Sequence, residues 1–178
     1  MDYITTANVL ATVFIVLGFL LVFLSHWLSV AALFPKFVDR CASHYRRPVV
    51  TTLIGFLLLF VPVTIGGAIN NVLPAALKWI GVVIMGLPIL IGLFGSAGLA
   101  QRIGAGMPTE QDHTQPWRRV LRGGTVLSLT FLLPIVGQVL VLPLVLASGM
   151  GTAVFAWVSG LRQSAPQLAA GDSPVASA

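Results

Sequence analysis

Long apolar runs separated by short polar segments dominate this sequence. Each run approaches or exceeds the roughly 20 mostly apolar residues that an α-helix needs to cross about 30 Å of hydrocarbon. The pattern therefore predicts an all-α integral membrane protein with about five transmembrane helices, at about residues 7–27, 49–68, 75–99, 123–136 and 139–160.

Turn-forming and interfacial residues set the expected ends of the first three helices. Residues 25–27 (Ser-His-Trp) mark the exit of the first helix at the membrane interface. The chain then continues as a helix to Leu33 and lies along the surface. Asn70-Asn71 favours a turn after the second helix. Pro74 suits the first turn of the third helix, which begins directly after it.

The last apolar run, residues 123–161, is too long for one span and just long enough for two. The expected break lies at 134–137 (Pro-Ile-Val-Gly), which makes the fourth span short. Residues 1–162 thus form one polytopic membrane domain. Residues 163–178 are rich in Ala, Ser, Gly and Pro and are expected to form a disordered tail.

Composition and charge agree with a membrane protein and indicate its orientation. Hydrophobic residues make up 57% of the chain and charged residues 8%, against roughly 25% charged in soluble domains. Cations flank the spans on one predicted side, with Lys78 alone on the other; the first set is Lys36, Arg40, Arg46, Arg47, Arg102, Arg118, Arg119, Arg122 and Arg162. The positive-inside rule then places the N-terminus outside and the C-terminus in the cytoplasm. The expected location is the bacterial inner (cytoplasmic) membrane.

The arginines at the ends of the apolar segments are expected to fix topology and to contact anionic lipid head groups. They are Arg46, Arg47, Arg118, Arg119 and Arg122. A net charge of +5 could also indicate nucleic-acid binding. The cations are distributed as membrane flanks rather than as one basic face, so no nucleic-acid partner is predicted.

A weak internal repeat suggests two hairpins after one entry helix. Arg46-Arg47 precedes Pro62 at the same spacing as Arg118-Arg119 precedes Pro134. Each unit would enter from a cytoplasmic arginine pair, turn near the outer face and return. Such a duplication has a pseudo-two-fold axis along the membrane normal; the alternative is convergent apolar composition.

No residue constellation in the sequence indicates a reaction, a cofactor or a metal. We therefore predict no catalytic, cofactor-binding or metal-binding residues, and no enzyme. His26 is interpreted as an interfacial residue, and Cys41 as a bystander thiol in a cytoplasmic loop. Glu110, Asp112 and His113 could form a metal site, but a solvated loop is the simpler interpretation.

Glycines are the more informative residues, because small side chains let membrane helices approach closely. The candidate packing positions are Gly81, Gly86, Gly92, Gly95 and Gly98 in the third span and Gly149 and Gly151 in the fifth. The third span is accordingly expected to be central.

Several short segments resemble a group of bacterial polytopic membrane proteins associated with bactofilins, the polymer-forming cytoskeletal proteins. They are residues 32–40 (Ala-Leu-Phe-Pro-Lys-Phe-Val-Asp-Arg), Arg47-Pro48 with Gly55, 86–88 (Gly-Leu-Pro) and 134–137. The chain departs from the group in lacking a bactofilin β-helix domain and in its longer central polar loop. The resemblance implies a membrane module without established catalytic activity that anchors or organises an assembly.

The leading hypothesis is a non-enzymatic structural or accessory membrane protein that packs against partner proteins, as a small subunit of a larger complex or as a homo-oligomer. The alternative is a small transporter or lipid-handling protein. That alternative needs polar groups at mid-depth, and the candidates are Thr64, Ser128, Thr130 and Gln138.

Overall fold

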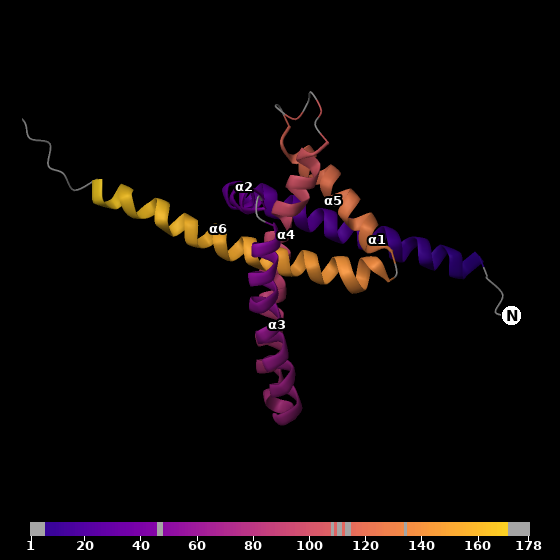
Figure 1. Ribbon diagram of the computed structural model, residues 1–178. Helices are drawn as coiled ribbons and strands as arrows, with labels where there is room; N and C mark the ends of the chain where they lie inside the picture. The colour runs from indigo at the N-terminus through magenta and orange to yellow at the C-terminus, as the bar shows by residue number, and fades with distance from the viewer. Residues whose placement is uncertain are drawn as a thin grey trace, which may run out of the picture.

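The computed structural model describes residues 6–45, 48–107, 109, 112, 115–133 and 135–170, with side chains up to residue 161. Every regular element in these ranges is a helix (Figure 1). In chain order they are α1 (Thr6–Leu33), α2 (Pro35–His44), α3 (Pro48–Val72), the 3-10 helix η1 (Ala75–Leu77), α4 (Lys78–Ala105), α5 (Trp117–Phe131), the π-helix η3 (Val136–Val141) and α6 (Leu142–Ala170).

Four helical segments in the described chain are long and apolar enough to cross a membrane. They are Thr6–Leu33, Pro48–Val72, Ala75–Ala105 and Val136–Leu161. Large apolar side chains cover their outward faces. A surface of this kind causes aggregation in water but is suited to lipid. The fold is therefore that of a multi-pass membrane protein.

The predicted short fourth span coincides with α5, which is not among the four long apolar helices. At 15 residues α5 is only about 22 Å long, less than the roughly 30 Å of a hydrocarbon core. The predicted break in the last apolar run is confirmed, because α5 ends at Phe131 and the next helix begins at Val136. Pro134 itself lies outside the described residues.

Two predicted ends differ from the structure. α3 continues through Asn70-Asn71 to Val72, and the turn comes at Leu73 and Pro74. Asn70 packs against α4, where its amide lies 3.9 Å from the Met85 sulfur, so tertiary contact outweighs the turn preference of asparagine. At the other end of the chain, the predicted disorder begins at residue 163, whereas α6 continues as a helix to Ala170.

Trp27 lies in the protein core, so its interpretation as an interfacial marker is wrong. Its side chain is 0% exposed, and its indole nitrogen donates a hydrogen bond to Ser96 Oγ of α4 at 2.9 Å. Its ring contacts Phe23 and Phe131, at centroid distances of 5.6 and 6.3 Å. The helix continues to Leu33 as predicted, because α1 packs here against α4 and α5.

α4 and α6 occupy the centre of the bundle. α4 packs against α2, α3, α5 and α6, and α6 packs against α2, α3 and α4. In Figure 1, α3 and α4 lie side by side as a hairpin joined by η1, while α6 and α1 run across that pair. The second predicted hairpin is not formed, because α5 packs along α4 rather than along α6.

The short helix α2 lies along one end of the bundle with an apolar inner face. Val38 and Cys41 on this face are buried against the bundle, whereas Lys36, Asp39 and Ser43 are exposed. Cys41 is thus a buried helical residue and not a loop thiol as predicted. Burial raises the pKa of the Cys41 thiol to about 12, which keeps it protonated and poorly reactive.

Replacing Trp27 by Phe tests its core position. The variant loses the hydrogen bond to Ser96 and part of the packed ring, so we expect the free energy of unfolding in mild detergent to fall by about 1–3 kcal/mol. The matched control is Trp79→Phe, because Trp79 is 62% exposed and its loss should leave stability unchanged. Equal effects of the two substitutions would place Trp27 at the lipid interface instead.

Candidate functional site

Glycines bring the backbones of α3 and α6 into contact. A methyl group at Gly55 would overlap the carbonyl oxygen of Ala147, and one at Gly151 would overlap the carbonyl oxygen of Thr51. The contact thus involves two small or polar residues from each helix, four positions apart in the sequence: Thr51 and Gly55 of α3, and Ala147 and Gly151 of α6. This is the arrangement by which membrane helices gain van der Waals contact where no hydrophobic drive exists.

α4 and α6 meet in the same way near the middle of α4. A methyl group at Gly95 would overlap the Gly149 carbonyl oxygen, and one at Gly149 would overlap the Gly92 carbonyl oxygen. A methyl group at Gly92 would lie 2.7 Å from the carbonyl oxygen of Leu146. None of these three positions has room for any other residue without displacing a backbone.

The remaining predicted packing glycines divide into two kinds. Added methyl groups at Gly81 and Gly98 would lie 2.5 Å from Asn70 Oδ1 and from the Cys41 Cβ atom, so both positions seat a neighbouring element. Gly86 does not share this role, because nothing lies within 4 Å of its added methyl group. Sequence reasoning missed Gly104 and Gly123, whose methyl groups would overlap the carbonyl oxygens of Arg119 and Ala100 at the crossing of α4 and α5.

The two outer crossings share a proline-to-glycine spacing that differs from the predicted internal repeat. α3 meets α6 at Gly55, and α5 meets α4 at Gly123. These glycines follow Pro48 and Pro116 at equal spacing. The correspondence of Pro48 with Pro116 is shifted by about one helical turn from the predicted one, in which Arg46-Arg47 corresponds to Arg118-Arg119.

A compact ionic cluster fixes the loop between α4 and α5 onto α5. Arg122 Nη2 donates to both carboxylate oxygens of Asp112 at 2.7 Å, and Nη1 donates to Thr109 Oγ1 at 2.7 Å. Thr109 Oγ1 donates in turn to Asp112 Oδ1 at 2.8 Å. Arg119 Nε lies 3.4 Å from Asp112 Oδ2.

Asp112 is therefore not the solvated loop residue that the sequence suggested. Only 5% of its surface is exposed. The hydrogen bond from Arg122 holds the pKa of its carboxyl at about 2, although burial acts in the opposite direction. A carboxyl with a lowered pKa stabilises the fold fully above its ordinary pKa, and this contribution is lost progressively as pH falls from there through about 2. Asp112 is thus ionised at physiological pH.

The predicted lipid-facing arginines have different surroundings. Arg119 and Arg122 bind Asp112, so they hold the loop as well as contributing positive charge. The Arg118 guanidinium lies 5.6 Å from the Trp117 ring centroid, a cation–π distance. Arg46 and Arg47 lie outside the described residues, as do Glu110 and His113.

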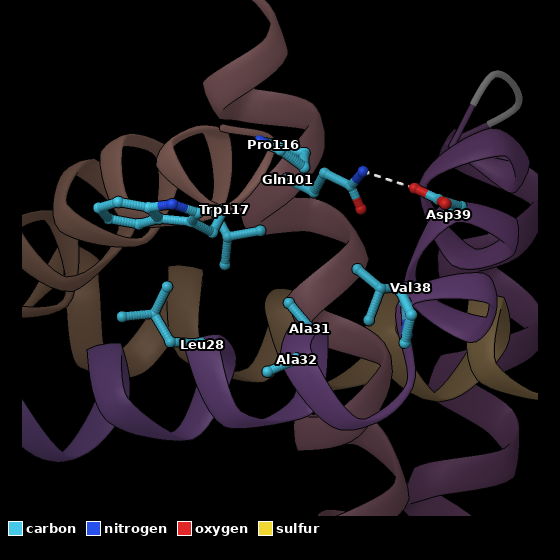
Figure 2. A pocket seen from close by; sticks show the side chains of 10 residues that line it. Leu28, Ala31, Ala32, Val38, Asp39, Gln101, Pro116 and Trp117 are labelled. Atoms are coloured by element: carbon cyan, nitrogen blue, oxygen red, sulfur yellow. Dashed lines mark hydrogen bonds between the residues drawn. The ribbon is translucent and has the colours of Figure 1, made fainter. Parts of the chain in front are cut away.

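A cavity of about 290 Å³ opens between α1, α2, α4 and α5 (Figure 2). Its walls are mostly apolar and come from Leu28, Ala31, Ala32, Pro35, Val38, Pro116, Trp117 and Val120. Asp39 and Gln101 line its edge, where Gln101 Nε2 donates to Asp39 Oδ1 at 2.7 Å. Gln101 Oε1 is buried and has no hydrogen-bond partner among the described residues.

Gln101 also lines a second, more polar cavity of about 370 Å³. Ser43, Arg102 and Arg119 contribute polar side chains to it. Arg102 is exposed, and no described carboxylate forms an ion pair with it. An apolar cavity and a cationic cavity thus adjoin one residue at the same end of the bundle.

The polar groups considered for mid-depth chemistry do not gather in one place. Thr64 and Thr130 donate their hydroxyl hydrogens to carbonyl oxygens of their own helices. Ser128 Oγ is buried without a hydrogen-bond partner among the described residues, and Gln138 is exposed on η3. None of the four lines either cavity described above.

The histidines are likewise separate. The His26 ring meets Phe94 edge-on at 5.5 Å, and His44 Nδ1 lies 2.8 Å from the Arg40 carbonyl oxygen. Within the described ranges no three His, Cys or acidic residues come together as metal ligands. The described residues therefore offer ionic and apolar contacts rather than a recognisable catalytic arrangement.

Comparison of the chain with protein-family models, with curated proteins and with solved structures finds no match.

Cleavage after Glu110 tests the ionic cluster, because Glu110 is the sole glutamate of the chain. We expect a glutamate-specific protease to cut the Asp112→Asn variant several-fold faster than the wild type, since the loop loses its hold on Arg122. The wild-type rate, corrected for the protease's own pH dependence, should stay constant between pH 5 and 8. Asp39→Asn removes a carboxylate elsewhere and should leave the rate unchanged; equal rates for wild type and Asp112→Asn would contradict the structural role of Asp112.

Proposed function

We propose that this chain is a non-enzymatic structural or accessory protein of the bacterial inner membrane, which packs against partner proteins in the bilayer. The observation that carries this proposal is the distribution of its glycines. Most glycines inside the long helices are in close contact with a neighbouring element. At Gly18, Gly67 and Gly86, by contrast, no atom lies within 4 Å of an added methyl group. By the same packing rule, each open glycine is a place where a further helix approaches.

α1 offers the best such surface. The hydrophobic window of this helix has no buried residue. Ala11, Gly18 and Ser25 are exposed and spaced seven residues apart, so they form one face two turns apart. Bulky exposed residues lie around them, with Phe14 between Ala11 and Gly18 on the same face and Leu17 to one side. Gly18 is the position on this face with open space for a close helix contact of the kind that Gly95 and Gly149 form between α4 and α6.

The short segments that resemble bactofilin-associated membrane proteins imply a module that anchors or organises an assembly, and such a module fits the same proposal. The internal polar contacts also agree with it. Trp27 with Ser96, and Asp112 with Arg122, join helices and loops to one another. The alternative transporter function gains no such support, since its candidate polar residues line neither described cavity.

Replacing Gly18 by Phe separates docking from folding. The position has open space around it, so we expect unchanged thermal stability in mild detergent. We also expect loss of the chain's stoichiometric partner, whether another subunit or a second copy, measured by in-membrane cross-linking and mass determination.

The matched control is Leu17→Phe, which enlarges an exposed residue on another face and should retain the partner. A wild-type chain that is monomeric in the membrane, with no cross-linked species, would contradict the proposal. Retention of the partner by Gly18→Phe would place the interface elsewhere and contradict the role of this face.

We further propose that the chain crosses the membrane five times, with its N-terminus outside and its C-terminus in the cytoplasm. The described cations Lys36, Arg40, Arg102 and Arg122 lie around α2, the end of α4 and the start of α5, whereas Lys78 lies at the opposite end of α4 (Figure 1). The positive-inside rule assigns the first end to the cytoplasm. In this proposal α5 and the turn after Phe131 supply the short fourth of the five crossings.

Reporter fusions test this topology. A fluorescent reporter that matures only in the cytoplasm should be active at the C-terminus and inactive at the N-terminus, and a periplasm-active phosphatase should give the reverse. Fusion of the phosphatase after Leu133 should be active. Both termini on the same side would contradict five crossings and indicate that α5 enters and leaves by one face.

A further inference from the structure

We propose that the end of the bundle around Gln101 binds one anionic glycerophospholipid. The phosphate lies in the polar cavity beside Arg102 and Arg119, and the first part of an acyl chain occupies the apolar cavity of Figure 2. This site is separate from the small-residue face of α1, so the two proposals stand or fall independently.

The surrounding elements place this site at the level of lipid head groups. α2 is amphipathic, with Val38 buried and Lys36 exposed, as in helices that lie in the membrane interface. Trp117 is 47% exposed at the start of α5, and interfacial Trp residues gather at this depth. The polar cavity and the ionic cluster lie beside these two elements.

The apolar cavity has the character of a chain-binding space. Ala31 and Ala32 line it from α1 together with Leu28, and Val120 and Trp117 line it from α5. Figure 2 shows Trp117 and Leu28 bordering the hollow, with the two alanines at its base. No charged side chain other than Asp39 lines it, which suits a hydrocarbon chain.

Charge at the polar cavity favours an anionic ligand. Arg119 and Arg122 share the single carboxylate of Asp112, which leaves an excess positive charge. Arg102 adds a second cation with no described carboxylate as its partner. Ser43 gives its hydroxyl hydrogen to the Arg40 carbonyl oxygen, so its oxygen is left as an acceptor.

The acceptors between the two cavities select the head group further. Gln101 Oε1 is buried without a donor among the described residues, and Asp39 has carboxylate oxygens beside it. A buried unpaired acceptor is costly. Hydroxyl groups on a head group would supply the missing donor while the phosphate remains beside the arginines. A phosphatidylglycerol-like lipid therefore fits both features.

Native mass spectrometry of the full chain measures this binding directly. The protein is incubated in mild detergent with equal amounts of phosphatidylglycerol, phosphatidylethanolamine and phosphatidylcholine that carry the same acyl chains. We expect one phosphatidylglycerol to be retained per chain. Arg102→Gln, which removes a phosphate partner, and Ala32→Phe, which fills the apolar cavity, should each reduce its retention about tenfold.

Matched controls keep the result specific. Lys78→Gln removes the cation at the far end of α4, and Ala68→Phe enlarges an exposed alanine of α3; both should retain the lipid like the wild type. All four variants should unfold at the wild-type temperature, since Arg102 and Ala32 are exposed.

Equal retention of the three lipids, preference for phosphatidylethanolamine, or wild-type retention by Arg102→Gln and Ala32→Phe would overturn the proposal. Complete displacement by millimolar glycerol phosphate would also overturn it, because the ligand would then be a soluble phosphate without an acyl chain.

Discussion

The backbone contact between α4 and α6 is the constraint on which the rest of this bundle depends. At Gly92, Gly95 and Gly149 the two helices approach until no side-chain atom fits between them. Lipid tails are as apolar as leucine side chains, so burial alone does not bring membrane helices together. The dispersion energy of close backbone contact does, and it requires glycine at these positions.

This central contact fixes the places of the other elements. α6 crosses α3 at Gly55 and Gly151, and α4 crosses α5 at Gly104 and Gly123. α1 then packs on α4 and α5 through Trp27 and its aromatic neighbours. The two cavities arise at the end of the bundle where α1, α2, α4 and α5 diverge from these crossings. Helix packing therefore positions the candidate lipid site.

The sequence predicts the helices themselves well, because hydrocarbon thickness imposes a length that apolar runs display directly. Four of the five predicted spans correspond to long apolar helices, and the predicted break at 134–137 overlaps the gap between α5 and the next helix. The sequence also predicts that the glycines of the third span seat neighbours, and Gly86 is the one that does not. Apolar composition cannot distinguish a residue that faces lipid from one that faces another helix. For that reason the pattern predicts an interfacial Trp27 and a pairing of α5 with α6, and the structure shows neither.

The candidate site was less predictable for a related reason. Whether Asp112 is solvated or buried depends on where a loop folds, and Arg122 reaches it only because α5 packs on α4. The apolar cavity combines α1 and α2 with α4 and α5, which are distant in the sequence. The hydrophobic periodicity of the sequence does not predict contacts between elements that are so far apart in the chain. The arginines alone predict contact with lipid head groups, but they do not predict where on the protein a lipid binds.

A double-mutant cycle on Gly95→Ala and Gly149→Ala tests the central contact most directly, with Gly86→Ala as the control in an open position. We predict that each single substitution at the crossing lowers the free energy of unfolding by about 1–3 kcal/mol. The double variant should lose less than the sum, by about 0.5 kcal/mol or more, because one displacement of the helices relieves both overlaps. Gly86→Ala should be neutral or slightly stabilising. Additive losses, or single variants as stable as Gly86→Ala, would contradict the claim that this backbone contact organises the bundle.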